Sequence, residues 1–279
     1  MKKIPTLFER EYKDHKVVGI KDILTSPDLQ KVLDGEMVKP TIKFDGSCCA
    51  VIDSKWYKRY DAKKGKKAPE GAIPCQNNPD PVTGHWPHWV KLDPDKAEDK
   101  WFIDAFKNYA RVHALNNKIH LPENELINYR LLDGTYEAIG PHFQGNPYDL
   151  EKDTLVIHGT EIIEELYGKK LTFEILRDYL EKHNIEGIVF WTTGYSENNY
   201  PICKIKRSDF GFEWPIKDTL KGHRMKCADL GEIPTIVDDT IIEKYIIPKK
   251  DIDLYLKCYD KTGVEDARDN NIGQSTGEL

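Results

Sequence analysis

The sequence predicts an α+β fold in which short strands outnumber helices. Residues 41–61 are the densest β-rich stretch, with three short runs separated by turns near Gly46 and at Asp53-Ser54. Residues 97–115 instead repeat their apolar residues at helical spacing, which places several aromatic side chains on one face. Further strands are expected at 135–140, 155–158, 185–192 and 202–206, and a second helix at 171–182.

Composition bounds the size and the compartment of this fold. The chain has 279 residues, of which 39% are hydrophobic and 32% are charged, enough for one large domain or one domain with an appendage. No run of about 18 apolar residues is present, so no membrane span is expected. The first residues turn polar too soon for a signal peptide. The six cysteines include no C-x-x-C pair, which favours free thiols and a reducing, cytoplasmic location.

Two stretches are expected to lack helices and strands. Residues 65–91 carry five prolines, which predicts a long loop that acts as a lid or a binding loop. Cys75, His85 and His88 in this loop have no fourth partner at the usual spacing, so ordinary loop residues are favoured over a zinc site. The polar stretch 261–279 predicts disorder.

The predicted domain boundary falls after residue 228. Residues 1–228 are expected to form the main domain, and 229–279 a small acidic appendage. Short helices are expected in the appendage at 241–247 and 251–259, and roughly its last 18 residues are expected to be disordered. The first 40 residues mix polar and apolar side chains and favour no assignment.

Charge is distributed unevenly, although the net charge is −6. Segment 55–67 has seven basic residues against one acidic residue, and segment 202–226 has seven against three. Segment 229–279 has six basic against twelve acidic residues. Local basic patches, rather than net charge, decide where phosphate groups bind. The patches therefore leave nucleic acid open as a ligand, with solvated lysine-rich loops as the alternative.

The tetrapeptide Lys43-Phe44-Asp45-Gly46 is the strongest chemical signal. It lies between two β-like runs, so Lys43 stands at the end of a strand. A lysine becomes a good nucleophile when a cationic or desolvating neighbourhood lowers its pKa, and Gly46 lets the backbone approach a ligand closely. This combination suits attack on a nucleotide α-phosphate. By itself the K-x-D-G pattern favours a surface hairpin with a solvated lysine, so the interpretation depends on the rest of the chain.

Four further segments follow in order. Arg59 lies in a strand predicted to pair with the motif strand, and Glu137 and Glu186 lie in apolar strands. Lys204 and Lys206 alternate on one face of a strand. Each has an ordinary alternative, because a lone strand glutamate usually faces solvent and alternating lysines usually protect an edge strand. Glu186 differs, since a glycine and four apolar residues follow it and a carboxylate there needs a cation or a metal.

Together these segments resemble the covalent nucleotidyltransferase superfamily, which includes polynucleotide ligases and mRNA-capping enzymes. The resemblance is closer to the ATP-dependent 5′-to-3′ RNA ligases of the vertebrate type, with bacterial and phage relatives, and it runs from about Thr41 to Pro215. It implies a nucleotidyltransferase (ATP-grasp-like) domain of antiparallel sheets flanked by helices. The motifs that carry the closer resemblance are residues 43–49, 84–90, 137–140 with 145–148, 157–159, 185–189 and 204–215.

The resemblance implies a three-step reaction in RNA repair. Lys43 attacks the α-phosphate of ATP and becomes lysyl-AMP, AMP passes to an RNA 5′-phosphate, and an RNA 3′-hydroxyl then displaces AMP. The implied cofactors are ATP, with AMP covalently bound to Lys43, and Mg²⁺, for which Mn²⁺ can substitute. The implied partner is RNA with 5′-phosphate and 3′-hydroxyl ends, bound by a monomer.

The resemblance also implies roles for the remaining site residues. Lys204 and Lys206 are expected to meet the triphosphate, to lower the pKa of Lys43 and to act with it in catalysis. Glu186 is expected to hold Mg²⁺, and Glu137 the ribose hydroxyls or a metal-bound water. Arg59 is expected to contact ribose or phosphate, and Asp45 to orient Lys43 or a hydrated metal. Glu186 and Glu137 are the expected metal ligands. The residues expected to bind the nucleotide are Lys43, Asp45, Gly46, Arg59, Glu137, Glu186, Lys204 and Lys206.

RNA contact is expected from two segments. The basic segment 55–67, with Lys63 and Lys64, is placed to approach the RNA backbone. His85 and Trp86 in the proline-rich loop, together with Trp89, offer rings that can stack on an exposed base. An equally good interpretation is that the tryptophans anchor this loop onto the core.

Three rival functions stay open, of which a plain binding module with an accidental lysine motif ranks last because it needs five coincidences in order. The first is another covalent nucleotidyltransferase, a DNA ligase or a GTP-using capping enzyme. Those families commonly carry arginine five residues after the motif lysine, whereas this chain has Cys48, which favours an RNA ligase. The second is a catalytically silent RNA-binding protein on the same scaffold, although all the charged motif residues are present.

Overall fold

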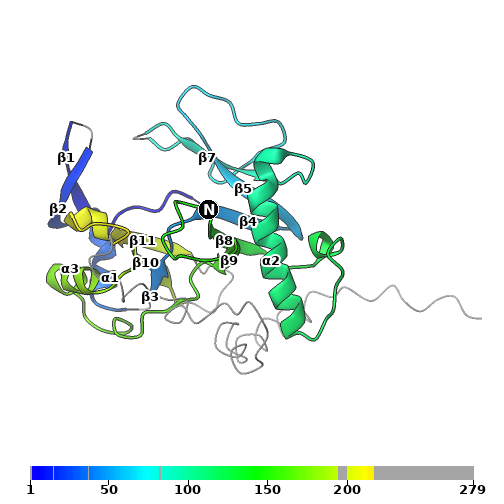
Figure 1. The fold of residues 1–279 in the computed structure, drawn as a ribbon. Helices are drawn as coiled ribbons and strands as arrows, with labels where there is room; N and C mark the ends of the chain where they lie inside the picture. Colours follow the sequence, from blue (N-terminus) through cyan, green and yellow to red (C-terminus); the bar gives the residue numbers. More distant parts are fainter. Residues whose placement is uncertain (1, 15, 37, 82, 194–199, 217–279) are drawn as a thin grey trace, which may run out of the picture. The chain divides into compact units, whose positions relative to one another are not determined.

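The computed structural model describes residues 2–14, 16–36, 38–81, 83–193 and 200–216. The predicted appendage, with its two short helices and its disordered end, lies outside the described residues. Within them the fold is mixed α and β, with antiparallel sheets and few helices, as the sequence predicts (Figure 1). None of the described helices is long and apolar enough to cross a lipid bilayer.

The larger sheet has six strands, all antiparallel, in the order β6-β7-β5-β4-β8-β9. Helix α2 (Lys100–Asn116) runs along one face of this sheet, and the ring of Phe106 stacks on that of Trp56 at 4.8 Å between centroids (Figure 1). The helix therefore buries its aromatic face, as its apolar spacing predicts. The strands are β4 (Ser47–Ile52), β5 (Lys55–Ala62), β6 (Ile73–Pro74), β7 (Trp86–Lys91), β8 (Gly134–Ile139) and β9 (Thr154–Ile157).

The smaller sheet has three antiparallel strands in the order β11-β10-β3. Its central strand, β10 (Gly187–Thr192), is buried along most of its length between β11 (Pro201–Lys206) and β3 (Val38–Lys43). Helix α3 (Phe173–Lys182) packs on it through Leu176 and Leu180, and Thr172 caps the start of this helix by accepting the N–H of Ile175.

The first 40 residues, to which the sequence assigned nothing, contain regular structure. Strands β1 (Phe8–Lys13) and β2 (Lys16–Leu24) form an antiparallel hairpin, and the short helix α1 (Gln30–Leu33) follows them. Leu7, Phe8 and Val32 lie in the same core cluster as α3 and β10. This segment therefore completes the core of the smaller sheet.

The prediction of an irregular loop at 65–91 is wrong at Ile73–Pro74, which forms strand β6, and at Trp86–Lys91, which forms strand β7. Proline is tolerated in this strand because of its orientation. The carbonyl of Pro87 accepts the N–H of Cys75 at 2.9 Å, so the missing N–H lies on the side of the two-residue edge strand β6. The missing N–H of Pro87 therefore removes a hydrogen bond only from the short pairing of β7 with β6.

The chain passes from the smaller sheet to the larger one through Phe44, Asp45 and Gly46, which join β3 to β4. Gly46 lies against the backbone of β8, and a Cβ built on it would stand 2.2 Å from the carbonyl oxygen of Ala138. A side chain at this position would push the link away from β8. The glycine of the K-x-D-G motif is therefore required by the close approach of the link to β8.

Candidate active site

Strand register brings Lys43, Glu186 and Lys206 together at one end of the smaller sheet. Lys43 on β3 and Lys206 on β11 both lie opposite Gly187, the first residue of β10. The Lys43 amine donates to Oε2 of Glu186, and the Lys206 amine lies 2.6 Å from Oε1 of the same carboxylate. Glu186 is 4% exposed, so this carboxylate has cationic partners, as its position in an apolar strand predicts.

Gly187 has a steric role in this arrangement. A Cβ at this position would lie 2.3 Å from the carbonyl oxygen of Ile205 and 2.9 Å from the Cα of Lys206. Its absence lets β11 approach β10 closely at the point where the ion pairs form. The E-G dipeptide therefore supplies both the carboxylate and the space that the lysine beside it needs.

Lys204 lies on the same face of β11 as Lys206, whereas Cys203 and Ile205 point into the core, as the alternation of the sequence predicts. Burial, followed by the charges of Lys43, Lys206 and Arg10, lowers the pKa of Lys204 to about 8, and Glu186 opposes this shift. The site thus concentrates positive charge, which suits an anionic ligand such as a triphosphate.

The shifted pKa of Lys204 predicts a pH-dependent difference in stability. Between pH 8 and 10.5 the unfolded chain keeps the Lys204 proton whereas the folded chain loses it. The free energy of unfolding of the wild type should therefore rise with pH in this window relative to that of Lys204→Met, by at most about 1.4 kcal/mol per pH unit. Urea unfolding of both proteins from pH 7 to pH 10 measures this difference, and a difference that stays constant with pH contradicts the prediction.

Side chains from later segments of the chain hold the link after Lys43. The Asp45 N–H donates to the hydroxyl of Tyr148 at 2.6 Å, and the Trp214 indole N–H donates to the Asp45 carboxylate at 2.8 Å. The Gly46 N–H donates to Oε1 of Glu137 at 3.1 Å. Asp45 therefore bonds to Trp214 in this structure, and its expected role in orienting Lys43 or a hydrated metal stays a prediction.

Glu137 has a second set of neighbours. Its Oε2 lies 2.8 Å from Nε2 of His158, and Cys48 lies opposite it in the ladder between β4 and β8. Burial and then the charge of Glu137 raise the pKa of the Cys48 thiol to about 12, while Arg59 acts in the opposite direction. Nε of Arg59 itself lies 2.9 Å from an oxygen of Asp61.

The sequence model of one protein family, described as RNA ligase 1, matches residues 72–233. The chain belongs to the RNA ligase 1 family. The matched segment includes Glu137, Glu186, Lys204 and Lys206, and it begins after Lys43.

Individual relatives extend this similarity over most of the chain. A protein named RNA ligase 1 from Pongo abelii is 28% identical over 271 residues, covering 77% of this chain and 79% of the relative. The proteins of the same name from Mus musculus and Rattus norvegicus are each 26% identical over 266 residues and cover 76% of this chain. The expectation of an RNA ligase is thus confirmed at the level of the family.

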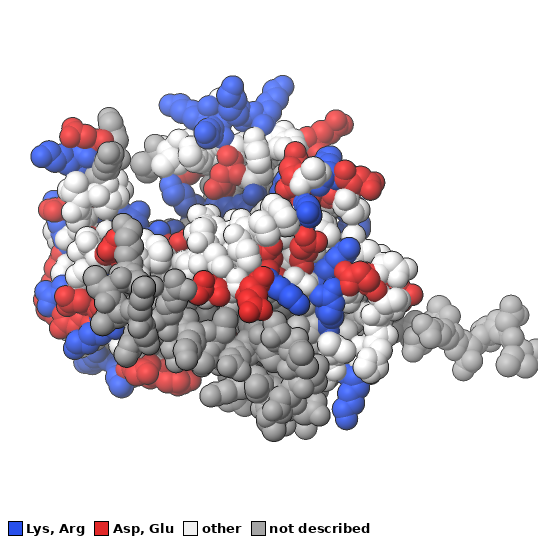
Figure 2. All heavy atoms as spheres, in the orientation of Figure 1, with Lys and Arg blue, Asp and Glu red and all other residues white. Residues whose placement is uncertain are grey.

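The residues predicted to bind RNA lie on neighbouring segments. Lys63 and Lys64 are exposed after β5, within a concentration of basic side chains over this part of the chain (Figure 2). The aliphatic part of Lys64 lies against Gly84, where a Cβ would be 3.0 Å from it, so the basic segment adjoins the residue before His85. His85 is exposed, whereas Trp86 is half-buried.

The two tryptophans of this region differ. Trp89 is 6% exposed and packs with Ala50 and Tyr57, so it anchors β7 onto the sheet and is not available for stacking on a base. Trp86 donates its indole N–H to the carbonyl of Gln76 at 2.7 Å, which fixes its ring at the edge of the loop. In this member of the RNA ligase 1 family, only Trp86 of the pair keeps an exposed portion for a ligand.

Several residues at the site carry no local signal in the sequence. Tyr148, Trp214 and His158 lie in segments that carried the resemblance, yet no pattern signalled their contacts with Asp45 and Glu137. Arg10 had no signal at all. It pairs with Asp209 at 2.7 Å, and Asp209 accepts the backbone N–H of Lys206 at 2.9 Å, so Arg10 acts on the end of β11 through this carboxylate.

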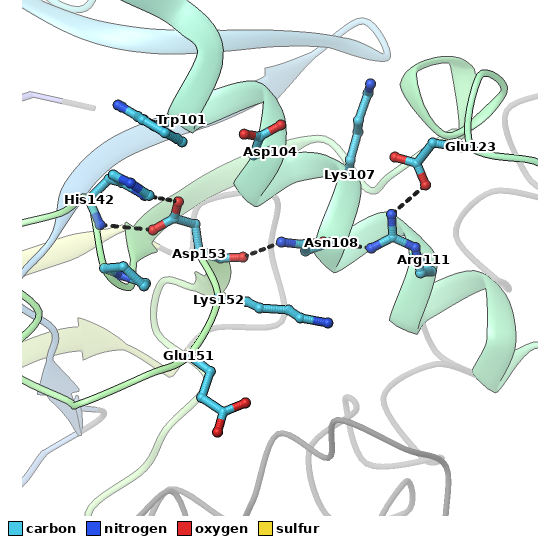
Figure 3. A pocket seen from close by; sticks show the side chains of 11 residues that line it. Trp101, Asp104, Lys107, Asn108, Arg111, Glu123, His142, Glu151, Lys152 and Asp153 are labelled. Carbon is cyan, nitrogen blue, oxygen red and sulfur yellow. Dashed lines mark hydrogen bonds and ion pairs between the residues drawn. The ribbon is translucent and has the colours of Figure 1, made fainter.

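A separate polar cavity of about 320 Å³ lies beside α2 and contains none of the predicted site residues (Figure 3). The imidazole of His142 lies against the ring of Trp101, and its Nδ1 is 2.7 Å from the carboxylate of Asp153. Asn108 donates to the carbonyl of Asp153 at 2.9 Å. These contacts join α2 to the segment between β8 and β9, which indicates a structural role for the polar groups.

Proposed function

We propose that this chain is an ATP-dependent RNA ligase that joins RNA 3′-hydroxyl and 5′-phosphate ends through lysyl-AMP on Lys43, and that it acts in RNA repair. The observation that carries the proposal is the contact of Glu186 with both Lys43 and Lys206 at a sheet end that also holds Lys204. Membership of the RNA ligase 1 family supports the RNA ligase class.

In the first step the amine nitrogen of Lys43 forms a bond to the α-phosphorus of ATP, and the bond to the pyrophosphate oxygen breaks. The amine must first give up a proton, and the Glu186 carboxylate that accepts its hydrogen bond is in place to receive it. Lys204 and Lys206 lie beside this amine, where positive charge stabilises the charge that develops on the phosphate oxygens.

In the second step an oxygen of the RNA 5′-phosphate attacks the phosphorus of lysyl-AMP, the P–N bond breaks, and the Lys43 nitrogen takes back a proton and leaves as the amine. In the third step the RNA 3′-hydroxyl oxygen bonds to the 5′-phosphate phosphorus, its proton leaves, and AMP departs with the oxygen that linked it. The same cationic groups serve all three steps, because each step breaks and forms a bond to phosphorus at this site and develops negative charge on the phosphate oxygens.

The donor chemistry of the site fits Mg²⁺. Carboxylate oxygens are the ligands that this ion prefers, and Glu186 and Glu137 supply them on either side of the link after Lys43. Glu186 would hold the ion directly or through water, and Glu137 would contact a metal-bound water or the ribose hydroxyls. Bound Mg²⁺ supplies neutralisation of phosphate charge.

Joining of a labelled RNA tests the proposal. A single-stranded RNA with 5′-phosphate and 3′-hydroxyl ends should be joined when ATP and Mg²⁺ are present, and 5′-adenylylated RNA should appear as an intermediate. The matched RNA with a 5′-hydroxyl should not react. Joining of nicked DNA but not of RNA, or a requirement for GTP, would indicate a rival nucleotidyltransferase. If neither joining nor lysyl-AMP is detected, the chain is a catalytically silent RNA-binding protein on the same scaffold.

A further inference from the structure

Three potential metal ligands of different types meet at the larger sheet. Sγ of Cys48, a carboxylate oxygen of Glu137 and a ring nitrogen of His158 all lie within 4.8 Å of one another. Cys48 is on β4, Glu137 is opposite it on β8, and His158 directly follows β9, the next strand. Adjacent strands therefore fix the spacing of this cluster. Glu137 is 9% exposed, and the other two residues are partly buried.

We propose that Cys48, Glu137 and His158 form a binding site for Zn²⁺ or a similar borderline-soft divalent cation, which would occupy Glu137 in place of the metal-bound water or ribose hydroxyls of the ligation reaction. Zinc binds thiolate, imidazole and carboxylate together, and three protein ligands leave a fourth position for water or another group. Ligand atoms around tetrahedral zinc are about 3.4–3.6 Å apart at ordinary bond lengths. The present cluster reaches that spacing with small side-chain movements.

The surroundings orient the ligands as metal sites require. Nδ1 of His158 is 3.0 Å from the hydroxyl oxygen of Thr135, which fixes the ring and leaves Nε2 directed at Glu137. The other oxygen of Glu137 accepts the Gly46 N–H at 3.1 Å, so the carboxylate is held as well. Each of these two ligands is thus anchored through one atom and presents the other to the cluster.

The ligand set selects the metal. Mg²⁺ takes oxygen ligands and has little affinity for sulfur or imidazole, so it should not compete here. Zinc binding releases the thiol proton of Cys48 and replaces the hydrogen bond between His158 and Glu137. Of the positive charges that act on the Cys48 thiol, that of Arg59 acts most strongly, and the paired carboxylate of Asp61 neutralises part of it. A bound ion would also hold Glu137, and with it the link that follows Lys43.

Metal titration of the full chain tests this site without ATP or RNA. After treatment with a chelator, the protein should take up one tight equivalent of Zn²⁺ in competition with a chromophoric chelator, and millimolar Mg²⁺ should not displace it. Co²⁺ in place of zinc should give a thiolate-to-metal charge-transfer band. In Cys48→Ser this band should vanish and zinc affinity should fall at least tenfold. Cys75→Ser, which alters a partly buried cysteine outside the cluster, should retain both.

The variant His158→Gln provides an independent test that leaves the cysteine in place. It should also lose at least tenfold in zinc affinity, and circular dichroism establishes that each variant is folded. If Cys48→Ser does not fold, His158→Gln decides alone. Zinc affinity equal to that of the wild type in a folded cluster variant overturns the proposal, as does a wild type that binds no zinc. A chain that forms lysyl-AMP but binds no zinc would refute this site and leave the ligase function standing.

Discussion

The Lys43→Ala protein should form no lysyl-AMP when incubated with ATP and Mg²⁺, whereas the wild type should gain the mass of one AMP. The variant lacks the only atom that the proposed first step bonds to phosphorus, so the loss should be complete rather than partial. Intact-protein mass spectrometry measures the adduct, and added pyrophosphate should reverse it in the wild type. Retention of full lysyl-AMP by Lys43→Ala would end the proposed mechanism.

Two control variants and one further substrate test whether the first step needs the covalent bond to Lys43 rather than only its positive charge. Lys43→Arg keeps a cation beside Glu186 yet cannot form the adduct, so it should fold normally and stay unlabelled. Lys39→Ala changes another lysine of β3, opposite Trp191 at the far end of the strand, and should be labelled like the wild type. RNA supplied with an adenylylated 5′ end should be joined by Lys43→Ala, because the third step needs no covalent lysine.

The sequence predicted the individual strands of the site because their signals are local. Alternation by two placed Lys204 and Lys206 on one face of β11, and the apolar run after Glu186 indicated a buried carboxylate. The contact of a single carboxylate with both Lys43 and Lys206 is, in contrast, not a local feature of the sequence. It depends on the pairing of β10 with β3, which brings Lys43 to Glu186, 143 positions away, and no local pattern encodes that register.

The failures have similar physical causes. Prolines predicted a loop up to residue 91, but Pro87 faces a short edge strand where its missing N–H costs little. The first 40 residues showed no clear period because the hairpin of β1 and β2 leaves Tyr12 and Val18 exposed, at 65% and 56%. The partners of Asp45, Tyr148 and Trp214, come from segments more than 100 residues away, so their contacts became visible only in the folded chain.

Glu186→Gln should slow formation of lysyl-AMP by roughly 10²–10³. Glutamine keeps the size of the side chain and can still accept a hydrogen bond, but it removes the negative charge that Lys43 and Lys206 share. Both lysines can then turn to solvent, since their side chains are 20% and 30% exposed. Single-turnover labelling with ATP measures the rate, and Glu164→Gln, an exposed carboxylate outside the site, should react as the wild type does.

A double-mutant cycle decides whether Glu186 acts through the two lysines. If its main role is to hold Lys206 and Lys43 in place, the labelling rate of the double variant Glu186→Gln with Lys206→Met should fall by far less than the product of the two single-variant factors. If Glu186 acts independently, for instance only through Mg²⁺, the losses should multiply. A labelling rate of Glu186→Gln equal to that of the wild type would contradict both roles, because the shared carboxylate is the feature that joins the three strands at this site.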